Sequence, residues 1–230
     1  MTPQTEPQPS VDNEFIISYY TLRKAIGWLG LLMPIIVRWG ARLLEKIPSH
    51  DSISAYYYTS MRDEFVGILA AIGVFLFCYR GPDKQDNFLT NVAGLCAIGI
   101  GLFPTAPIYH ERISSQYNTT SLECYSNHGP LGFHIYIVAA FFLIISYLAI
   151  CRFPKPSQPY ITKQKLKRNM IYRICGGVMI IMLIAIVAIK AINKDQSIFW
   201  PETVAIVAFG IAWLVKGQAI LKDKDIIKPA

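Results

Sequence analysis

The chain has 230 residues, of which 53% are hydrophobic and 16% are charged, and its formal net charge at pH 7 is +7. This composition is too apolar for an ordinary soluble domain, and it favours an integral membrane protein. No nucleic-acid-binding motif accompanies the positive charge, so we expect no nucleic-acid partner.

Six apolar runs organise the chain. A helix needs about 20 mostly apolar residues to cross a bilayer core that is about 30 Å thick. The first run is the shortest, because it is uninterrupted only from Ala25 to Val37 and must be extended through Arg38 and Arg42. The pattern predicts an all-α, polytopic integral membrane protein, a six-transmembrane-helix bundle with spans at about 25–44, 60–79, 88–106, 131–153, 170–192 and 199–221.

The two ends of the chain are polar. Residues 1–18 contain three prolines and lack the pattern of a signal peptide, so we expect a disordered tail before a transmembrane domain at 19–221. Residues 222–230 form a short tail. Most lysines and arginines of the short loops fall on the side of both termini, which the positive-inside rule assigns to the cytoplasm. We therefore expect a multi-pass protein of the plasma membrane (the inner membrane of a bacterium) with cytoplasmic N and C termini.

The opposite, non-cytoplasmic side collects polar and aromatic residues. The segment 52–64 leads into the second span, and further ionisable groups lie near the outer ends of the fourth and sixth spans. Ionisable groups inside a membrane bundle are costly unless they are paired or functional. We expect a lipid or ligand pocket at this interface, with the tyrosines as its aromatic rim; the candidate residues are Ser54, Tyr56, Tyr57, Tyr58, Arg62, Asp63, His134 and Glu202.

The same groups allow several kinds of chemistry. They can be interfacial helix caps and ion pairs with a structural role only. A metal-activated water could be held by His110, His128 and His134 together with Asp63 or Glu202, but no compact motif such as HExxH is present. We therefore expect no metal and no cofactor. A serine nucleophile is also disfavoured, because no serine of the outer segment stands in a GxSxG sequence.

Short motifs relate the chain to a known family. An Ile53-Ser54 pair follows the first span, a glycine-rich third span closes in Phe103-Pro104, and His134 lies early in the fourth span. This layout resembles the bacterial six-span membrane proteins of the domain of unknown function 998 type, and is more distantly similar to the DRAM and FRAG membrane proteins. The resemblance implies a six-helix bundle. The bacterial group has no assigned activity, the eukaryotic relatives are linked to lipid handling, and no catalytic residue can be transferred.

Three functions are consistent with these patterns. We favour a non-enzymatic protein that interacts with lipids or a partner through the outer pocket. The alternative is a lipid hydrolase or transferase at the same pocket, with catalytic candidates His134, Asp63 and Glu202. The third is a small transporter or channel, which needs a polar path through the bundle. Membrane lipids are the expected partners, and association with a second copy of the chain or with another membrane protein stays open.

Overall fold

The computed structural model describes residues 11–46, 50–105, 132–155, 163–193 and 196–221, and it is all-helical there, with 82% helix and no strand. The all-α prediction is thereby confirmed. The described residues form six long helices and two single turns, a 3₁₀ turn (η1) and a π-helical turn (η2) that continues α6. Their bounds are α1 Val11–Glu45, η1 Ser54–Tyr58, α2 Arg62–Cys78, α3 Lys84–Leu102, α6 Phe133–Tyr147, η2 Leu148–Arg152, α7 Lys163–Ile192 and α8 Phe199–Lys216.

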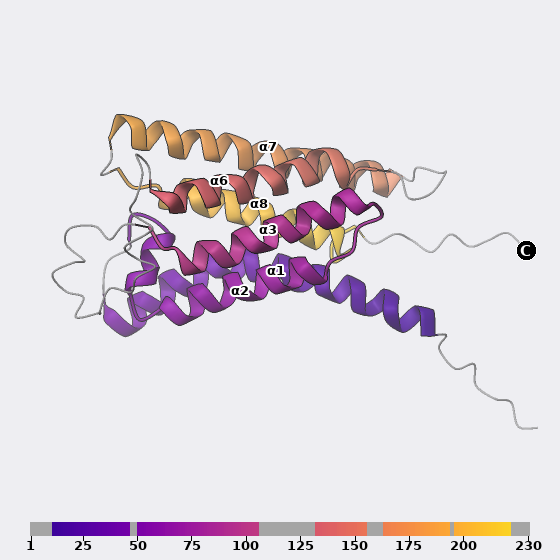
Figure 1. The fold of residues 1–230 in the computed structure, drawn as a ribbon, viewed down its shortest axis with the longest axis horizontal. Helices are drawn as coiled ribbons and strands as arrows, with labels where there is room; N and C mark the ends of the chain where they lie inside the picture. The colour runs from indigo at the N-terminus through magenta and orange to yellow at the C-terminus, as the bar shows by residue number, and fades with distance from the viewer. Residues whose placement is uncertain (1–10, 47–49, 106–131, 156–162, 194–195, 222–230) are drawn as a thin grey trace, which may run out of the picture.

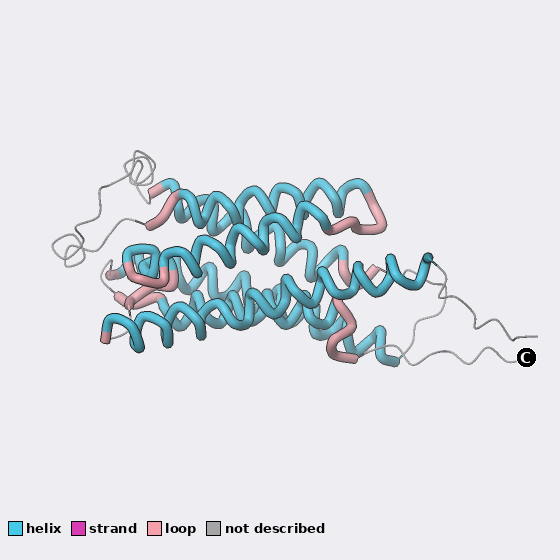
Figure 2. The backbone as a smooth tube through the Cα atoms, turned by 90° about the horizontal axis from the view of Figure 1, so that it is seen from below, coloured by secondary structure: helices cyan, strands magenta, loops and turns pink. Residues whose placement is uncertain are grey.

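The helices run side by side along the long axis of the molecule (Figures 1 and 2). Helix α8 packs between α1 and α7, and α3 packs between α2 and α6. One end of the bundle holds the start of α1, the α2–α3 turn, η2 and the end of α8, and we name it the termini end. The other end holds η1 and the starts of α2, α6 and α8, and we name it the cover end.

Two helix pairs approach each other closely at glycines. A Cβ atom added at Gly27 of α1 would lie 2.8 Å from the carbonyl oxygen of Gly210 in α8. A Cβ at Gly94 of α3 would lie 2.7 Å from the carbonyl oxygen of Gly73 in α2. Real Cβ contacts are longer than this, so only glycine fits at both crossings. Small residues allow the same close approach between helices in membranes.

The outer surface of the bundle is apolar. Large hydrophobic side chains are exposed on every long helix, for example Val74 of α2, Leu95 of α3 and Ile184 of α7. Four helices are long and apolar enough to cross a membrane, namely α1 from Tyr19, α6 with η2, α7 and α8. These helices indicate a membrane protein. Helix α2 has 17 residues, and α3 begins with the polar sequence Lys-Gln-Asp-Asn, so the predicted count of six spans is not confirmed.

The N-terminal helix is longer than the sequence pattern predicts. Helix α1 begins at Val11, inside the segment 1–18 that we expected to be a disordered tail. No proline follows Pro9 until Pro34, so nothing in the backbone chemistry of residues 11–18 opposes a helix. Residues 1–10 and 222–230, which include the rest of both predicted tails, lie outside the described residues.

An ion-pair network joins the α2–α3 turn to the end of η2. Arg152 contacts Asp86 through its Nε atom and Asp83 through its guanidinium at 2.5 Å, and Lys155 contacts Asp83 at 2.9 Å. Asp86 is only 3% exposed, so its buried negative charge needs the ion pair with Arg152. Hydrogen bonding to Lys155, followed by the charge of Lys155, lowers the pKa of Asp83 below its ordinary value.

The depressed pKa of Asp83 predicts a component of acid sensitivity. A carboxyl group whose pKa is lower in the folded state stabilises the fold above its unfolded pKa, near 3.8, and this stabilisation is lost as the pH falls through the folded pKa. We expect Asp83→Asn to lower the unfolding temperature at pH 7, and we expect the difference from wild type to shrink as the pH falls below 3.8. Thermal unfolding of both proteins across this range measures the difference, and a difference that does not change with pH would contradict the prediction.

Candidate functional site

The cover end is closed by residues 51–61, which we name the cover segment. The segment passes over the bundle between α1 and α2, and η1 is its central turn. Its first residue is attached to the start of α8, because the Ile198 N–H and the Ser197 hydroxyl donate hydrogen bonds to the Asp51 carbonyl at 2.7 and 3.2 Å. The cover segment is therefore attached to α8 through its Asp51 carbonyl, independently of the side chains that line the pocket.

Glu202, in the first turn of α8, fixes the next two residues of the cover segment. Its carboxylate accepts the Ser52 hydroxyl at 2.9 and 3.0 Å and the Ile53 N–H at 2.6 Å. The Ser52 hydroxyl oxygen in turn accepts the Ser54 N–H at 3.2 Å. A carboxylate near the N-terminus of a helix is also stabilised by the helix dipole. Glu202 thus positions Ile53 and Ser54 at the cover end of the bundle.

His134, at the start of α6, binds Ser54 from the other side. The Nδ1 atom lies 2.6 Å from the Phe103 carbonyl oxygen, and Nε2 lies 2.9 Å from Ser54 Oγ. A carbonyl oxygen can only accept, so Nδ1 carries the proton. In the neutral ring Nε2 is then an acceptor, and the Ser54 hydroxyl donates to it. His134 and Ser54 are 5% and 7% exposed, so this is a buried hydrogen bond between two helical elements.

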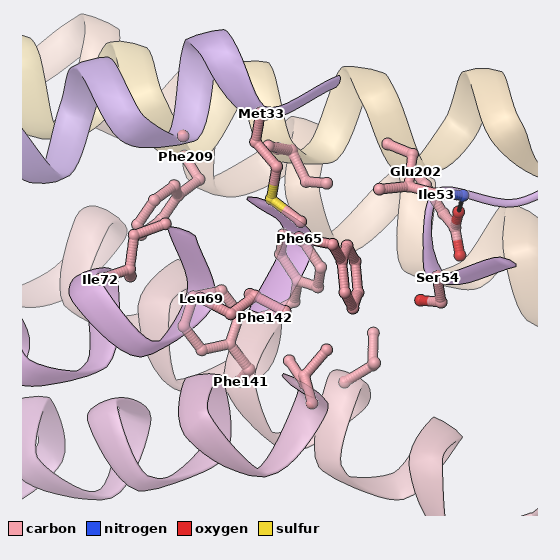
Figure 3. Close-up of a pocket in the computed structure, with 14 residues that line it drawn as sticks. Met33, Ile53, Ser54, Phe65, Leu69, Ile72, Phe141, Phe142, Glu202 and Phe209 are labelled. Atoms are coloured by element: carbon pink, nitrogen blue, oxygen red, sulfur yellow. Dashed lines mark hydrogen bonds between the residues drawn. The ribbon is translucent and has the colours of Figure 1, made fainter. Parts of the chain in front are cut away.

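A cavity lies below these groups, among α1, α2, α3, α6 and α8 (Figure 3). It has about 540 Å³ of empty volume, part of it open to the outside. In the close-up, Ser54 and Glu202 lie at one end, and Ile72 and Phe209 lie at the other. All lining residues except Ser54 and Glu202 are non-polar; they are Gly30, Met33, Ile53, Phe65, Leu69, Ile72, Ile100, Val138, Phe141, Phe142, Ile206 and Phe209.

The three adjacent tyrosines do not form an exposed rim. Tyr56 and Tyr57 are 1% and 5% exposed, and burial raises the pKa of Tyr56. Tyr56 packs edge-to-face on Phe199 at the start of α8, with 6.4 Å between ring centroids. The half-buried Tyr58 donates its hydroxyl to the Thr105 carbonyl at 2.7 Å, beyond the end of α3. The tyrosines therefore anchor the cover segment to its neighbours and do not line the cavity.

Arg62 and Asp63 also lie apart from the cavity. Arg62 donates a hydrogen bond to the Tyr57 hydroxyl, and its guanidinium carbon lies 4.2 Å from the centre of that ring. Asp63 is exposed in the first turn of α2, where a carboxylate stabilises the helix N-terminus. The expected cluster of Arg62, Asp63, His134 and Glu202 is therefore divided, and only His134 and Glu202 reach Ser54 or its neighbours.

The predicted absence of a metal site stays a prediction. Within the described ranges no three His, Cys, Asp or Glu side chains are grouped so that they could hold a metal ion. Two of the low-ranked ligand candidates, His110 and His128, lie outside those ranges.

Several residues that build the site are not among the predicted site residues. Ser52 holds Glu202, and the Phe103 carbonyl fixes the tautomer of His134. Phe103 carried a signal, because it follows α3 and the last carbonyls of a helix lack intrahelical partners. The phenylalanines of the cavity carried none, since membrane helices are apolar on every face.

Comparison of the chain with protein-family models, with curated proteins and with solved structures gives no match, so the resemblance to the domain of unknown function 998 proteins stays a prediction.

Proposed function

We propose that the protein binds the chain of a single-chain amphiphile, such as a fatty acid or a lysolipid, in the cavity beneath the cover segment. The observation that carries the proposal is the uneven distribution of polar groups. Polar side chains of the lining occur only at the end formed by Ser54 and Glu202, while the remaining wall is aliphatic and aromatic. This division matches a ligand with one polar end and one apolar chain.

The composition and origin of the lining support this class of ligand. The empty volume of about 540 Å³ includes space that is open to the outside, so the residues that line the cavity, and not this volume, carry the proposal. The lining is contributed by five helices and η1, so a ligand there contacts most of the bundle. An ion or a polar solute would leave its hydration shell for a mostly apolar wall, which disfavours the transporter hypothesis.

The polar end can hold a headgroup without losing its own structure. The Ser54 hydroxyl oxygen donates its proton to His134 and keeps lone pairs that can accept a hydrogen bond from a ligand. Glu202 has two carboxylate oxygens, and together they offer more acceptor positions than Ser52 and Ile53 use. We therefore expect the headgroup to be a hydrogen-bond donor, such as a hydroxyl, a protonated acid or an ammonium.

The membrane placement is part of the same proposal. The exposed apolar residues on α2 and α3 support six spans rather than four, with these two helices also facing lipid. The excess of lysine and arginine in the loops of the termini end supports a cytoplasmic position for that end. The polar end of the cavity then lies toward the non-cytoplasmic headgroup region.

A larger side chain inside the cavity is expected to prevent binding of the ligand. Val138 lines the cavity from α6, and Val138→Phe would add a ring where the chain of the amphiphile lies. We expect at least about a tenfold drop in the amphiphile that co-purifies with the protein in detergent, because overpacking and ligand burial compete for the same space. Quantitative mass spectrometry of the extracted lipids measures this.

The matched control adds the same ring elsewhere. Val187 of α7 is 48% exposed and does not line the cavity, so Val187→Phe should retain wild-type amounts of the amphiphile. Equal amounts of ligand in wild type, V138F and V187F would show that the lipid is bound on the outer surface, and would contradict the proposed site.

One contact favours a second candidate function, a lipid ester hydrolase or acyltransferase. Ser54 Oγ donates to His134 Nε2 at 2.9 Å, as a serine nucleophile does to its general base, and Nδ1 is oriented by the Phe103 carbonyl. Ser54 Oγ would attack the ester carbonyl carbon, and His134 would pass the serine proton to the leaving alcohol. Water would then release the acyl group from the serine.

This candidate ranks second because of the neighbouring backbone. The Ile53 N–H donates to Glu202, the Ser54 N–H to Ser52, and the Ala55 N–H to the Ser52 carbonyl. Acyl transfer usually needs free backbone donors near the nucleophile for the developing oxyanion. The donors of these three residues are already used inside the cover segment, so binding is the better supported function.

A further inference from the structure

Two basic residues, Arg23 of α1 and Lys216 of α8, are in contact at the termini end, far from the cavity. The Arg23 guanidinium of α1 donates to the Lys216 carbonyl at the end of α8, with 3.3 Å between the atoms. The Lys216 ammonium lies 4.7 Å from the centre of the Phe153 ring. Within the part of the chain that the structure describes, neither side chain is paired with a carboxylate. Neither basic group thus has a counter-ion among these residues.

Aromatic rings surround this pair. The Arg23 guanidinium carbon lies 4.0 Å from the centre of the Tyr19 ring and 5.3 Å from that of Tyr79. The Trp213 ring lies 5.1 Å from Tyr79 and 5.4 Å from Phe153, between centroids. Trp213, Tyr79 and Phe153 are at most 2% exposed. The rings exclude water from one side of the cations, so an ionic partner would be bound more strongly there than at an open surface.

Buried hydrogen-bond donors in this cluster lack acceptors. Trp213 Nε1, Arg23 Nε and the Tyr19 hydroxyl are buried and have no hydrogen-bond partner among the described residues. The indole and guanidinium N–H groups can only donate, and a tyrosine hydroxyl can donate as well. Buried polar groups in proteins are normally satisfied. A cluster of unmet donors beside two cations indicates a missing acceptor that carries negative charge.

The wider charge distribution points the same way. Besides Arg23, the charged groups that act on Lys216 are Lys165, Arg168 and Asp86. The carboxylate of Asp86 is already bound by Arg152. Arg23 also has a structural role, because a cation stabilises the C-terminus of a helix such as α8. That contact uses one N–H group and leaves the other donors of Arg23 available.

We propose that Arg23, Lys216 and the Trp213 indole bind a phosphate group at the termini end. A phosphate carries negative charge and several strong acceptor oxygens, which matches a cluster of donors better than a single carboxylate does. The group belongs to the headgroup of an anionic lipid or to a soluble phosphate compound. This site does not rest on the proposed function of the cavity, which lies at the other end of the bundle.

The test compares ligands and matched variants of the full-length protein in detergent. The unfolding temperature is titrated with phosphatidylglycerol, with zwitterionic phosphatidylcholine and with inorganic phosphate. The variants are Lys216→Met, Arg23→Gln and Trp213→Phe. Trp213→Phe keeps the packing of a ring and removes the N–H donor. The control is Lys84→Gln, which removes one positive charge from an exposed position at the same end of the bundle.

We expect saturable stabilisation by phosphatidylglycerol and none by phosphatidylcholine. Lys216→Met and Arg23→Gln should weaken binding at least about tenfold, Trp213→Phe about two- to tenfold, and Lys84→Gln less than twofold. Saturation by inorganic phosphate alone, with the same variant pattern, would also support the site and assign it to a soluble phosphate compound. Equal effects of both lipids, or an equal loss in Lys84→Gln and Trp213→Phe, would overturn the proposal.

Discussion

Replacement of Glu202 by alanine is expected to destabilise the protein strongly and to release the cover segment. The substitution leaves the Ser52 hydroxyl and the buried Ile53 N–H without their acceptor. Each buried donor that loses its partner costs about 1–3 kcal/mol, so the free energy of unfolding should fall by about 2–6 kcal/mol. Thermal unfolding of the detergent-purified protein, followed by tryptophan fluorescence, measures the change.

The position of the carboxylate, and not its charge alone, explains this effect. Glu64 is exposed in the first turn of α2 at the same end of the bundle, and Glu64→Ala should cost less than about 1 kcal/mol. Glu202→Gln should fall between the two, since one amide oxygen still accepts a hydrogen bond. A Glu202→Ala protein as stable as Glu64→Ala would show that the cover segment does not depend on Glu202.

The second large effect is expected at His134. His134→Ala removes the acceptor of the Ser54 hydroxyl and the donor of the Phe103 carbonyl, and it opens space in the core. The loss should be about 2–5 kcal/mol, while Ser54→Ala alone should cost about 1 kcal/mol. In the double variant the two losses should not add, and the coupling energy should be about 1–2 kcal/mol.

A ring on the same helix provides the control. Tyr136 of α6 is 48% exposed, so Tyr136→Ala should change stability by less than about 0.5 kcal/mol and should show no coupling to Ser54→Ala. Additive losses for His134→Ala and Ser54→Ala would contradict a direct bond between them. The same variants separate the two candidate functions, since covalent labelling of wild type but not of Ser54→Ala by a fluorophosphonate would favour the hydrolase.

The class of the protein and one half of the site could be predicted from sequence. Long apolar runs require helices, because an unpaired backbone is too costly in lipid, and their polar ends show which segments meet. Ser54 and His134 were thus predicted to face the same pocket, and they are in contact. The predicted placement of Asp63 in the same pocket as His134 differs from the structure. Asp63 and Glu202 both lie in the first turn of a helix, and only packing separates them.

The other half of the site depends on contacts between distant segments, which no local sequence pattern encodes. Membrane helices are apolar on all sides, so periodicity does not show which phenylalanines, such as Phe141 and Phe209, turn toward a cavity. A run of tyrosines at a membrane interface predicts an exposed belt. Here the 3₁₀ turn η1 folds Tyr56 and Tyr57 inward, where Phe199 and Arg62 contact them.

The most direct test of the cavity as a binding site is photocrosslinking with a fatty acid that carries a diazirine at its far end, followed by peptide mapping. If the polar end lies at Ser54 and Glu202, the labelled residues should include Ile72 and Phe209 at the opposite end of the cavity. Labelling should fall in Val138→Phe and persist in Val187→Phe. Crosslinks confined to exposed positions such as Leu95 and Ile184, unchanged in both variants, would contradict the account.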